Sequence, residues 1–457
     1  MILKQFEEKG LSHYSYATGC SEIGQIAIID PRYDVDLYLE FAEENNLVIS
    51  HVFETHIHAD YASGARYLAA RSGAEHVLSG YDKEEKYEVS FPHKECFDGD
   101  LFKLGKVTLK VLHTPGHTPE HVSFLMLIDE EPKALFSGDF IFVGSVGRPD
   151  LIGKEVTESL AKQLYHSVSE KLKDLPDSLE IYPAHGSGSF CGGGVVDRPY
   201  STLGQERLSN PFLNPSISER EFVDLVLSRT PHLPDYYFRM KVYNSCSERE
   251  QIRTPIPLDP LDFQKHIDKG GVVIDLRNQT AFSRGHIPGA ICIGAGEKLG
   301  FWASSAVSYD CPILLVTSTP LQVEEAIHSL ARIGLNRVEG YLEGGMEAWN
   351  KKELPLDEIP ELTPQDLFKE KEVLHIIDVR SEGEWAGGHI ADAKHIPCSE
   401  LTKRIKELPD GKIAFVCAGG YRSILAASVA KKLGREIVFH LPGGVLAWRT
   451  AGLPLTI

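Results

Sequence analysis

The stretch FETHIHADYASG (residues 53–64) places two histidines and an aspartate within five positions, at His56, His58 and Asp60. Imidazole and carboxylate groups in so short a segment are typical of a metal site. The next residue is Tyr61, and a neutral phenol, with a pKa of about 10, binds divalent ions weakly. The stretch therefore predicts a metal site in which position 61 contributes no strong ligand.

Three further clusters of ligand-type residues follow strand-like runs in the first half of the chain. They are HTPGHT with His113 and His117, FSGDF with Asp139, and YPAHGSG with His185. Polar clusters at strand ends lie where open α/β sheets usually bind their ligands. Their recurrence predicts that these clusters meet in one site. His113 precedes a Pro-Gly turn, and we interpret it as structural.

The order of these motifs resembles the metallo-β-lactamase fold and, within it, the glyoxalase II and persulfide dioxygenase branch. The resemblance covers residues 1 to about 250 and includes GRPD (147–150) and LSNP (208–211). It implies an αββα sandwich. The αββα sandwich would be followed by two rhodanese-like doubly wound α/β domains, whose motifs are described below.

Two ligand arrangements are known on this scaffold, and the resemblance implies different residues for each. The persulfide dioxygenase pattern has one Fe(II) per chain on His56, His117 and Asp139, with zinc as a possible substitute. His58, Asp60 and His185 would then surround and orient the ligands. In the hydrolase pattern His56, His58 and His117 would bind one zinc ion. Asp60, residue 61 and His185 would bind the other, with Asp139 bridging the two. Because residue 61 is tyrosine, we expect the single-iron arrangement.

Two further residues are candidates for substrate contacts. Arg148 in VGRPD could pair with a substrate carboxylate or phosphate, or could form a loop salt bridge with Asp150. Cys191 in GSFCGGG follows His185 closely and could gate the site or exchange sulfur, although an inert cysteine is the alternative. Glutathione-using relatives resemble AHDY where this chain has AHGS (184–187). The carrier thiol therefore stays open between glutathione, coenzyme A and other thiols.

The second half of the chain repeats itself at a spacing of about 100 residues. VVIDLRNQTAFSRGHIPGA (272–290) matches HIIDVRSEGEWAGGHIADA (375–393), and YLEGGMEAW (341–349) matches HLPGGVLAW (440–448). Alternating apolar strands and helices predict parallel sheets covered on both faces. Pro-rich linkers place the expected domains at 1–250, 255–355 and 360–457.

The loop CAGGYRS (417–423) lies between an apolar strand and a helix in the second copy. Gly419 and Gly420 would let backbone N–H groups point at the sulfur of Cys417, and Arg422 would add a positive charge. This loop resembles the active-site loop of rhodanese domains. In the first copy Thr317 and Gln322 stand at the positions of Cys417 and Arg422, so we expect that copy to be inactive.

Composition excludes several other classes of function. A formal net charge of −18 at pH 7 argues against nucleic acid or an anionic membrane as a partner. No apolar run is long enough to span a bilayer, and the start lacks a secretory signal. Eight scattered cysteines indicate reduced thiols, so we expect a cytoplasmic protein. We also expect a homo-oligomer.

The whole chain resembles persulfide dioxygenase–rhodanese fusions that detoxify sulfide. The resemblance implies that the first domain oxidises a low-molecular-weight thiol persulfide with O2 to sulfite and thiol. Cys417 would transfer sulfur between persulfide, sulfite and thiosulfate in either direction. Two alternatives remain: a glyoxalase II-like dinuclear zinc thioester hydrolase, and a non-catalytic sulfur carrier or sensor.

Overall fold

The computed structural model of the protein describes residues 1–249 and 252–457. The chain divides into two units, Met1–Glu250 with Arg332–Gly334, and Gln251–Ala331 with Leu335–Ile457. The predicted end of the first domain at residue 250 lies outside the described residues. None of the helices in the described ranges has the length and apolar character needed to cross a membrane.

Two six-stranded sheets form the centre of the first unit. One has the order β1-β2-β3-β4-β5-β6, and the other has the order β14-β13-β10-β9-β8-β7. The strands of the first sheet are β1 (Ile2–Glu8), β2 (His13–Cys20), β3 (Gln25–Ile29), β4 (Val48–Phe53), β5 (Glu75–Ser79) and β6 (Lys94–Cys96). Those of the second are β7 (Leu101–Leu104), β8 (Val107–His113), β9 (Val122–Ile128), β10 (Glu131–Gly138), β13 (Glu180–Pro183) and β14 (Ser201–Thr202). A small hairpin joins β11 (Ile141–Phe142) to β12 (Ser145–Val146).

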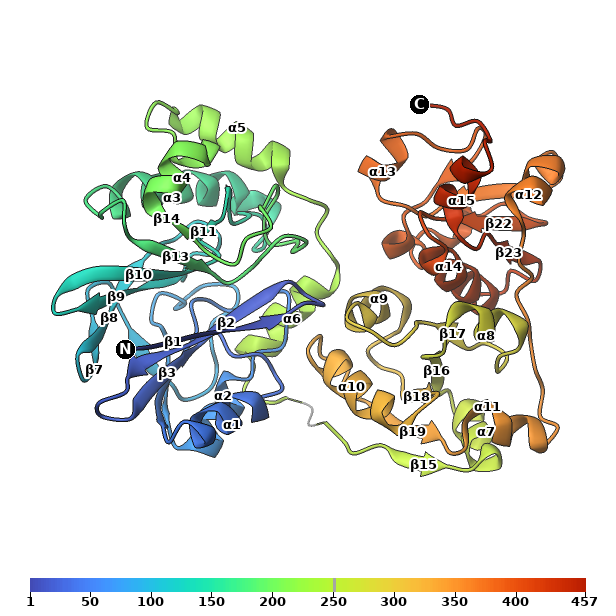
Figure 1. The fold of residues 1–457 in the computed structure, drawn as a ribbon, viewed down its shortest axis with the longest axis horizontal. Helices are drawn as coiled ribbons and strands as arrows, with labels where there is room; N and C mark the ends of the chain where they lie inside the picture. The colour runs from blue at the N-terminus through green and yellow to red at the C-terminus, as the bar shows by residue number, and fades with distance from the viewer. Residues whose placement is uncertain (250–251) are drawn as a thin grey trace. The chain divides into compact units, whose positions relative to one another are not determined.

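Helices cover the outer face of each sheet (Figure 1), which gives four layers. Beside the first sheet lie α1 (Asp36–Glu44) and α2 (Ala65–Ser72). Beside the second lie α3 (Lys154–Lys171), α4 (Leu203–Ser209), the short 3-10 turn η1 (Pro211–Leu213) and α5 (Glu219–Arg229). The helix α6 (Tyr236–Ser245) ends the unit. The arrangement is the αββα sandwich expected from the sequence.

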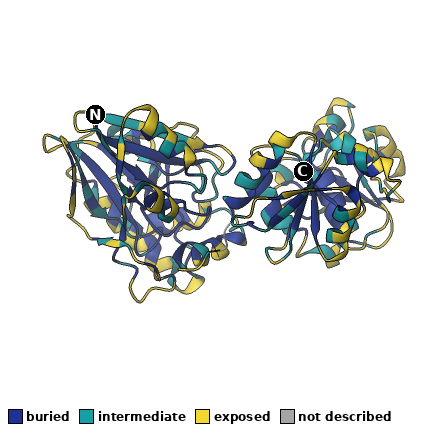
Figure 2. Cartoon of the chain, turned by 90° about the horizontal axis from the view of Figure 1, so that it is seen from below, coloured by how far each residue is buried: buried dark blue, intermediate teal, exposed yellow. Residues whose placement is uncertain are grey.

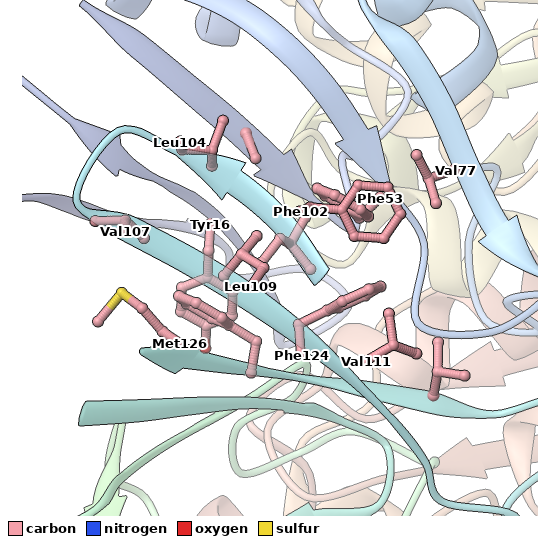
Figure 3. Packing of buried hydrophobic residues seen from close by; sticks show 14 of the residues in the cluster. Tyr16, Phe53, Val77, Phe102, Leu104, Val107, Leu109, Val111, Phe124 and Met126 are labelled. Atoms are coloured by element: carbon pink, nitrogen blue, oxygen red, sulfur yellow. The ribbon is translucent and has the colours of Figure 1, made fainter. Parts of the chain in front are cut away.

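The core between the sheets follows from strand periodicity, because alternate side chains of a strand point to opposite faces. Along β9, Val122, Phe124 and Met126 join the cluster between the two sheets, whereas Leu125 packs under α3 and α5. Figure 3 shows Phe124 close to Phe53 of the opposite sheet, and their ring centroids lie 4.8 Å apart. Truncating a buried phenylalanine such as Phe124 to alanine would cost roughly 3–5 kcal/mol.

The second unit contains two parallel sheets, one from each sequence repeat. The first copy has strands β15 (Ile256–Leu258), β16 (Val272–Asp275), β17 (Ile291–Cys292), β18 (Ile313–Val316) and β19 (Val338–Leu342). Its helices are α7 (Pro260–Asp268), α8 (Gln279–Arg284), α9 (Leu299–Ala306), α10 (Pro320–Ala331) and α11 (Gly345–Lys351).

The second copy has strands β20 (His375–Asp378), β21 (Lys394–His395), β22 (Ile413–Val416) and β23 (Val438–His440). Its helices are α12 (Pro364–Glu370), α13 (Glu382–Ala386), α14 (Tyr421–Lys432) and α15 (Gly444–Thr450), with 3-10 turns η2 (Cys398–Glu400) and η3 (Ile405–Glu407).

The two copies share one strand order. The order β19-β18-β16-β17 in the first corresponds to β23-β22-β20-β21 in the second. All of these neighbours pair in parallel, as the alternation of strands and helices predicts. Figure 2 shows the strands largely buried and the exposed residues on helix faces and loops. The loop that carries Cys417 therefore follows the buried strand β22, and the matching loop that carries Thr317 follows the buried strand β18.

Candidate metal centre and sulfur-transfer loop

The ligand-type residues of the first unit lie just beyond the carboxyl ends of four strands. His56 and its neighbours follow β4, His117 follows β8, Asp139 follows β10 and His185 follows β13. The structure brings these four loops together, although the strands belong to two different sheets. All four side chains are fully buried.

His56, His117 and Asp139 form a group in which one ligand atom from each residue lies within 4.8 Å of the others. The Nε2 atom of His117 is 3.1 Å from Oδ2 of Asp139, and Nε2 of His56 is 4.0 Å from the same oxygen. These nitrogens and both Asp139 oxygens are buried without a hydrogen-bond partner. Orphaned polar atoms at such depth are costly unless a cation satisfies them. The residues therefore fit a divalent metal ion.

The protonation of the two histidines suits metal binding. Burial lowers the pKa of both His56 and His117 well below the usual value, so each imidazole is neutral. The Nδ1 atom of His117 lies 2.8 Å from the carbonyl oxygen of Arg148 and donates to it. A proton on Nδ1 leaves the Nε2 lone pair free for a metal. Burial raises the pKa of Asp139 to about 6.

A second group of ligand-type residues lies beside the first. It contains Asp60, His185 and Cys191, also within 4.8 Å of one another and buried. The Nε2 atom of His185 is 3.3 Å from Oδ2 of Asp60 and 3.5 Å from Oδ1 of Asp139. Asp139 thus presents one oxygen to each group. Asp60 and His185 were expected to surround the iron ligands in the single-iron pattern and to bind the second ion in the hydrolase pattern, and here they belong to a set that could hold a second ion.

Tyr61 is not part of either group. Its hydroxyl donates to the carbonyl oxygen of Asp30 at 3.2 Å, and burial raises its pKa well above the usual value. The phenol therefore contributes no ligand, as its chemistry predicts. Cys191 supplies instead a third ligand-type atom beside Asp60 and His185. Because Cys191 can take the place of a ligand at position 61, the tyrosine there is weaker evidence against a second metal ion.

Asp30, at the end of β3, is a site residue that the sequence analysis missed. Its carboxylate accepts hydrogen bonds from the backbone N–H of Thr55 at 2.7 Å and the Thr55 hydroxyl at 2.9 Å. It also lies 3.0 Å from Nε2 of His58. Burial alone would lower the pKa of His58, but Asp30 outweighs it and raises that pKa to about 9. His58 therefore pairs with Asp30 and supports the ligand loop. The sequence signal that could have identified Asp30 is its position at the end of the apolar run QIAIID.

Arg148 holds the loop that carries Cys191. Its guanidinium donates to Asp150 at 2.6 and 2.9 Å and to the carbonyl oxygen of Phe190 at 2.9 Å. Its backbone N–H donates to the carbonyl oxygen of Cys191 at 2.8 Å. The loop salt bridge considered from the sequence is therefore present, while a contact with substrate stays a prediction. Cys191 itself is buried, with its sulfur 3.8 Å from the Tyr237 hydroxyl.

His113 and His121 show how similar histidines differ in role. Nε2 of His113 lies 2.9 Å from the carbonyl oxygen of Pro119, its ring stacks on Tyr81 at 3.8 Å between centroids, and it belongs to neither ligand group. His121, which the sequence analysis missed, accepts the backbone N–H of Asp139 on Nε2 at 3.0 Å. It therefore positions the aspartate without offering a ligand atom to either group.

In the second unit, the loop of Cys417 lies between β22 and α14. The backbone N–H of Gly420 donates to the Cys417 sulfur at 3.0 Å, and Gly420 adopts a φ of 103°, which favours glycine. The carbonyl oxygen of Cys417 accepts the N–H of Val445 at 2.7 Å. The loop therefore directs a backbone donor at the sulfur, as the glycines predict. That donor is Gly420, so a matching role for the N–H of Gly419 stays a prediction.

In the first copy, the side chain of Gln322 hydrogen-bonds to the backbone of the matching loop, which follows β18. The Oε1 atom of Gln322 accepts the backbone N–H of Ser318 at 2.8 Å and that of Thr319 at 3.4 Å. These two N–H groups are therefore already occupied, and Pro320, at the position of Gly420, has no N–H to donate. Together with Thr317 at the cysteine position, the Gln322 amide supports the expectation of an inactive copy.

Comparisons with known proteins agree with both halves of the structure. The metallo-beta-lactamase superfamily model matches residues 18–185, and the rhodanese-like domain model matches residues 259–352 and 364–451. A hydroxyacylglutathione hydrolase, GloC of Haemophilus influenzae, is 31% identical over 41% of this chain and 87% of its own. The mitochondrial persulfide dioxygenase ETHE1 of Homo sapiens is 30% identical over 50% of this chain and 80% of its own.

A solved structure covers more of the chain. The crystal structure of a metallo-beta-lactamase from Staphylococcus aureus subsp. aureus COL is 37% identical, with a TM-score of 0.67. It covers 75% of this chain and 98% of that chain. The fold and family expected from the motifs are thereby confirmed.

Proposed function

Because the chain belongs to the metallo-beta-lactamase superfamily and carries two rhodanese-like domains, we propose that it oxidises a thiol persulfide and transfers its sulfur. The first reaction is RSSH + O2 + H2O giving RSH, sulfite and two protons. The second is sulfur transfer through a persulfide on Cys417. The observation that carries the proposal is the presence, in one chain, of a buried two-histidine, one-carboxylate group and a rhodanese-like cysteine loop.

His56, His117 and Asp139 would hold one Fe(II), which supplies the redox chemistry when bound. Two histidines and one carboxylate on one side of an iron leave positions open for substrate and O2. Backbone and neighbouring groups hold these residues in place: the carbonyl of Arg148 fixes the tautomer of His117, and His121 orients Asp139. A site whose ligands are prearranged keeps reactants together, which is the usual gain from templating.

The experiment is anaerobic loading with Fe(II), followed by metal analysis and O2 uptake with persulfides of glutathione and coenzyme A. We expect one iron per chain and persulfide-dependent O2 consumption. Cys417→Ser should consume O2 at the wild-type rate but lose sulfur transfer, whereas His117→Ala should show the reverse pattern. An iron-loaded protein that leaves O2 untouched while cleaving S-acyl thiols would contradict the proposal.

A second candidate is a two-metal thioester hydrolase, and one specific observation favours it. Asp60, His185 and Cys191 could bind a second ion, with Asp139 facing both sites. Thiolate and imidazole ligands suit zinc. Burial raises the pKa of Cys191 well above its usual value, so its thiolate would require the cation. A relative named hydroxyacylglutathione hydrolase is as similar to this chain as the persulfide dioxygenase.

Metal stoichiometry separates the two candidates. If the hydrolase is correct, zinc-loaded protein holds two ions and Cys191→Ser lowers the content toward one. If the dioxygenase is correct, one iron is bound and the same substitution leaves the content unchanged. Tyr237→Phe is a matched control, because it removes the hydroxyl 3.8 Å from the Cys191 sulfur but no ligand atom.

A further inference from the structure

The charge expected beside Cys417 is already paired in the structure. Both terminal nitrogens of the Arg422 guanidinium donate to the carboxylate of Glu384, at 2.6 and 2.7 Å. A bidentate arginine–carboxylate pair of this kind uses an N–H edge of the guanidinium that could otherwise bind an oxyanion. While Glu384 is in place, Arg422 therefore offers a substrate neither this edge nor an unpaired charge.

The pair is held in position on both sides. Hydrogen bonding from Arg422 lowers the pKa of Glu384 to about 2, so the carboxylate is ionised. One oxygen of Glu384 also accepts the backbone N–H of Ser381 at 3.0 Å, and the Ser381 hydroxyl oxygen accepts the backbone N–H of Glu384 at 3.4 Å, which together form a capping box on α13. Arg422 is the second residue of α14 and comes two residues after Gly420, whose N–H contacts the Cys417 sulfur, so Arg422 belongs to the loop that surrounds this cysteine.

The first copy shows that the fold does not require this pair. In the aligned repeats Ala281 stands where Glu384 does, and Gln322 stands where Arg422 does. Both partners are therefore absent from the copy that also lacks the cysteine. The copy keeps the same strand order without them. The Glu384–Arg422 pair is therefore present in the copy that has the cysteine and is not needed to form the fold.

We propose that Glu384 sets the sulfur-donor preference of the Cys417 site, favouring a thiol persulfide over thiosulfate by occupying Arg422. The inference rests on the proposed sulfur transfer at Cys417 and names its substrate class. Thiosulfate carries two negative charges, whereas a persulfide carries at most one at its reacting end. The donor with the larger charge loses more when the nearby guanidinium is already neutralised.

The transfer balances for either donor. With a persulfide, the Cys417 thiolate attacks the outer sulfur of RS–SH, the S–S bond breaks, and RS⁻ leaves with the electron pair. With thiosulfate, the thiolate attacks the sulfane sulfur and sulfite leaves as a dianion. A new Cys417–sulfur bond forms in each case, and no external oxidant or reductant is needed. The leaving sulfite dianion would also gain from a free guanidinium.

The test is Glu384→Gln in the full chain. Glutamine can still close the capping box, so the substitution removes the charge and not the helix cap. The readout is the rate at which Cys417 gains one sulfur atom, followed by mass spectrometry of the Cys417 peptide, with thiosulfate or glutathione persulfide as donor. Glu382→Gln, an exposed position on the same helix, is the matched control.

We expect Glu384→Gln to raise the thiosulfate rate relative to the persulfide rate by roughly tenfold, about what one charge-assisted hydrogen bond contributes. Adding Arg422→Gln should abolish that gain, because the gain depends on the freed guanidinium. Glu382→Gln should keep the wild-type ratio.

An unchanged ratio in Glu384→Gln, or a gain that persists without Arg422, would overturn the inference and leave the proposed sulfur transfer standing. A wild-type protein that takes sulfur from neither donor would overturn the sulfur transfer itself.

Discussion

Replacing Asp30 by asparagine should weaken metal binding although Asp30 is not a ligand. In the structure the Thr55 hydroxyl donates its single proton to Oδ2 of Asp30 at 2.9 Å. The same hydroxyl must therefore accept at its 3.0 Å contact with Nδ1 of His56. A proton on Nδ1 leaves Nε2, the atom facing Asp139, free to bind a metal. Asp30 thus selects the tautomer of His56.

Asparagine at position 30 would reverse the donor and acceptor roles along this relay, the chain of hydrogen bonds from residue 30 through the Thr55 hydroxyl to His56. The backbone N–H of Thr55 points at Oδ1 of residue 30, so the amide oxygen of the introduced asparagine must stay on that side and its NH2 group must face the Thr55 hydroxyl. The hydroxyl then accepts from the amide and donates to Nδ1 of His56, which moves the imidazole proton to Nε2. Residue 30 has a φ of 52°, which asparagine tolerates, so the backbone adds no strain.

The expected loss in metal affinity is about 10–100-fold, the usual effect of a residue that orients a ligand, or about 1.4–2.7 kcal/mol. The assay is competition between the full-length apo-protein and a chromogenic chelator for Zn²⁺ or Co²⁺. Asp82→Asn is the control, because Asp82 is a buried aspartate of the same unit whose carboxylate accepts the N–H of Val89 at 2.7 Å. A folded Asp30→Asn protein that binds metal as tightly as the wild type would refute the relay, as would an equal loss in Asp82→Asn.

Three further predictions concern the two sites and the stability of the first unit. His117→Ala should lower bound metal at equal free metal by more than about tenfold, measured by elemental analysis. Glu54→Gln should reduce the fall in thermal unfolding temperature that occurs as the pH is lowered. Burial would raise the pKa of Glu54, but the hydrogen bond with His76 lowers it to about 2. The stabilisation by Glu54 is therefore present above pH 4.5 and is lost as the pH falls toward 2. An identical fall in the variant would contradict this. Gly444→Ala should slow sulfur loading of Cys417, because a Cβ there would lie 2.1 Å from the Cys417 carbonyl oxygen at a φ of 55°; Gly452→Ala, also at positive φ but with open space around it, should load normally.

The architecture could be predicted because its signals are local. Alternating apolar residues in runs such as β9 specify which side chains face each core, and the repeat of about 100 residues specifies two similar parallel sheets. The ligand-type residues His56, His117 and Asp139 follow strands, so their convergence at the sheet edges could be expected. Cys417 was equally visible, because its loop joins a strand to a helix.

The partners of these residues depended on tertiary structure. Asp30 lies 25 residues before Thr55, Glu384 lies 38 residues before Arg422, and neither pair is marked by a short motif. Likewise, Cys191 lies beside Asp60 in a loop that hydrogen bonds from Arg148 hold in place. Sequence by itself determined the fold class and the candidate reactive groups, since strand periodicity and strand-end motifs are properties of neighbouring residues. Tertiary structure decided tautomers, charge pairing and the second ligand group, because hydrogen bonds between distant segments depend on how strands and loops are brought together in space.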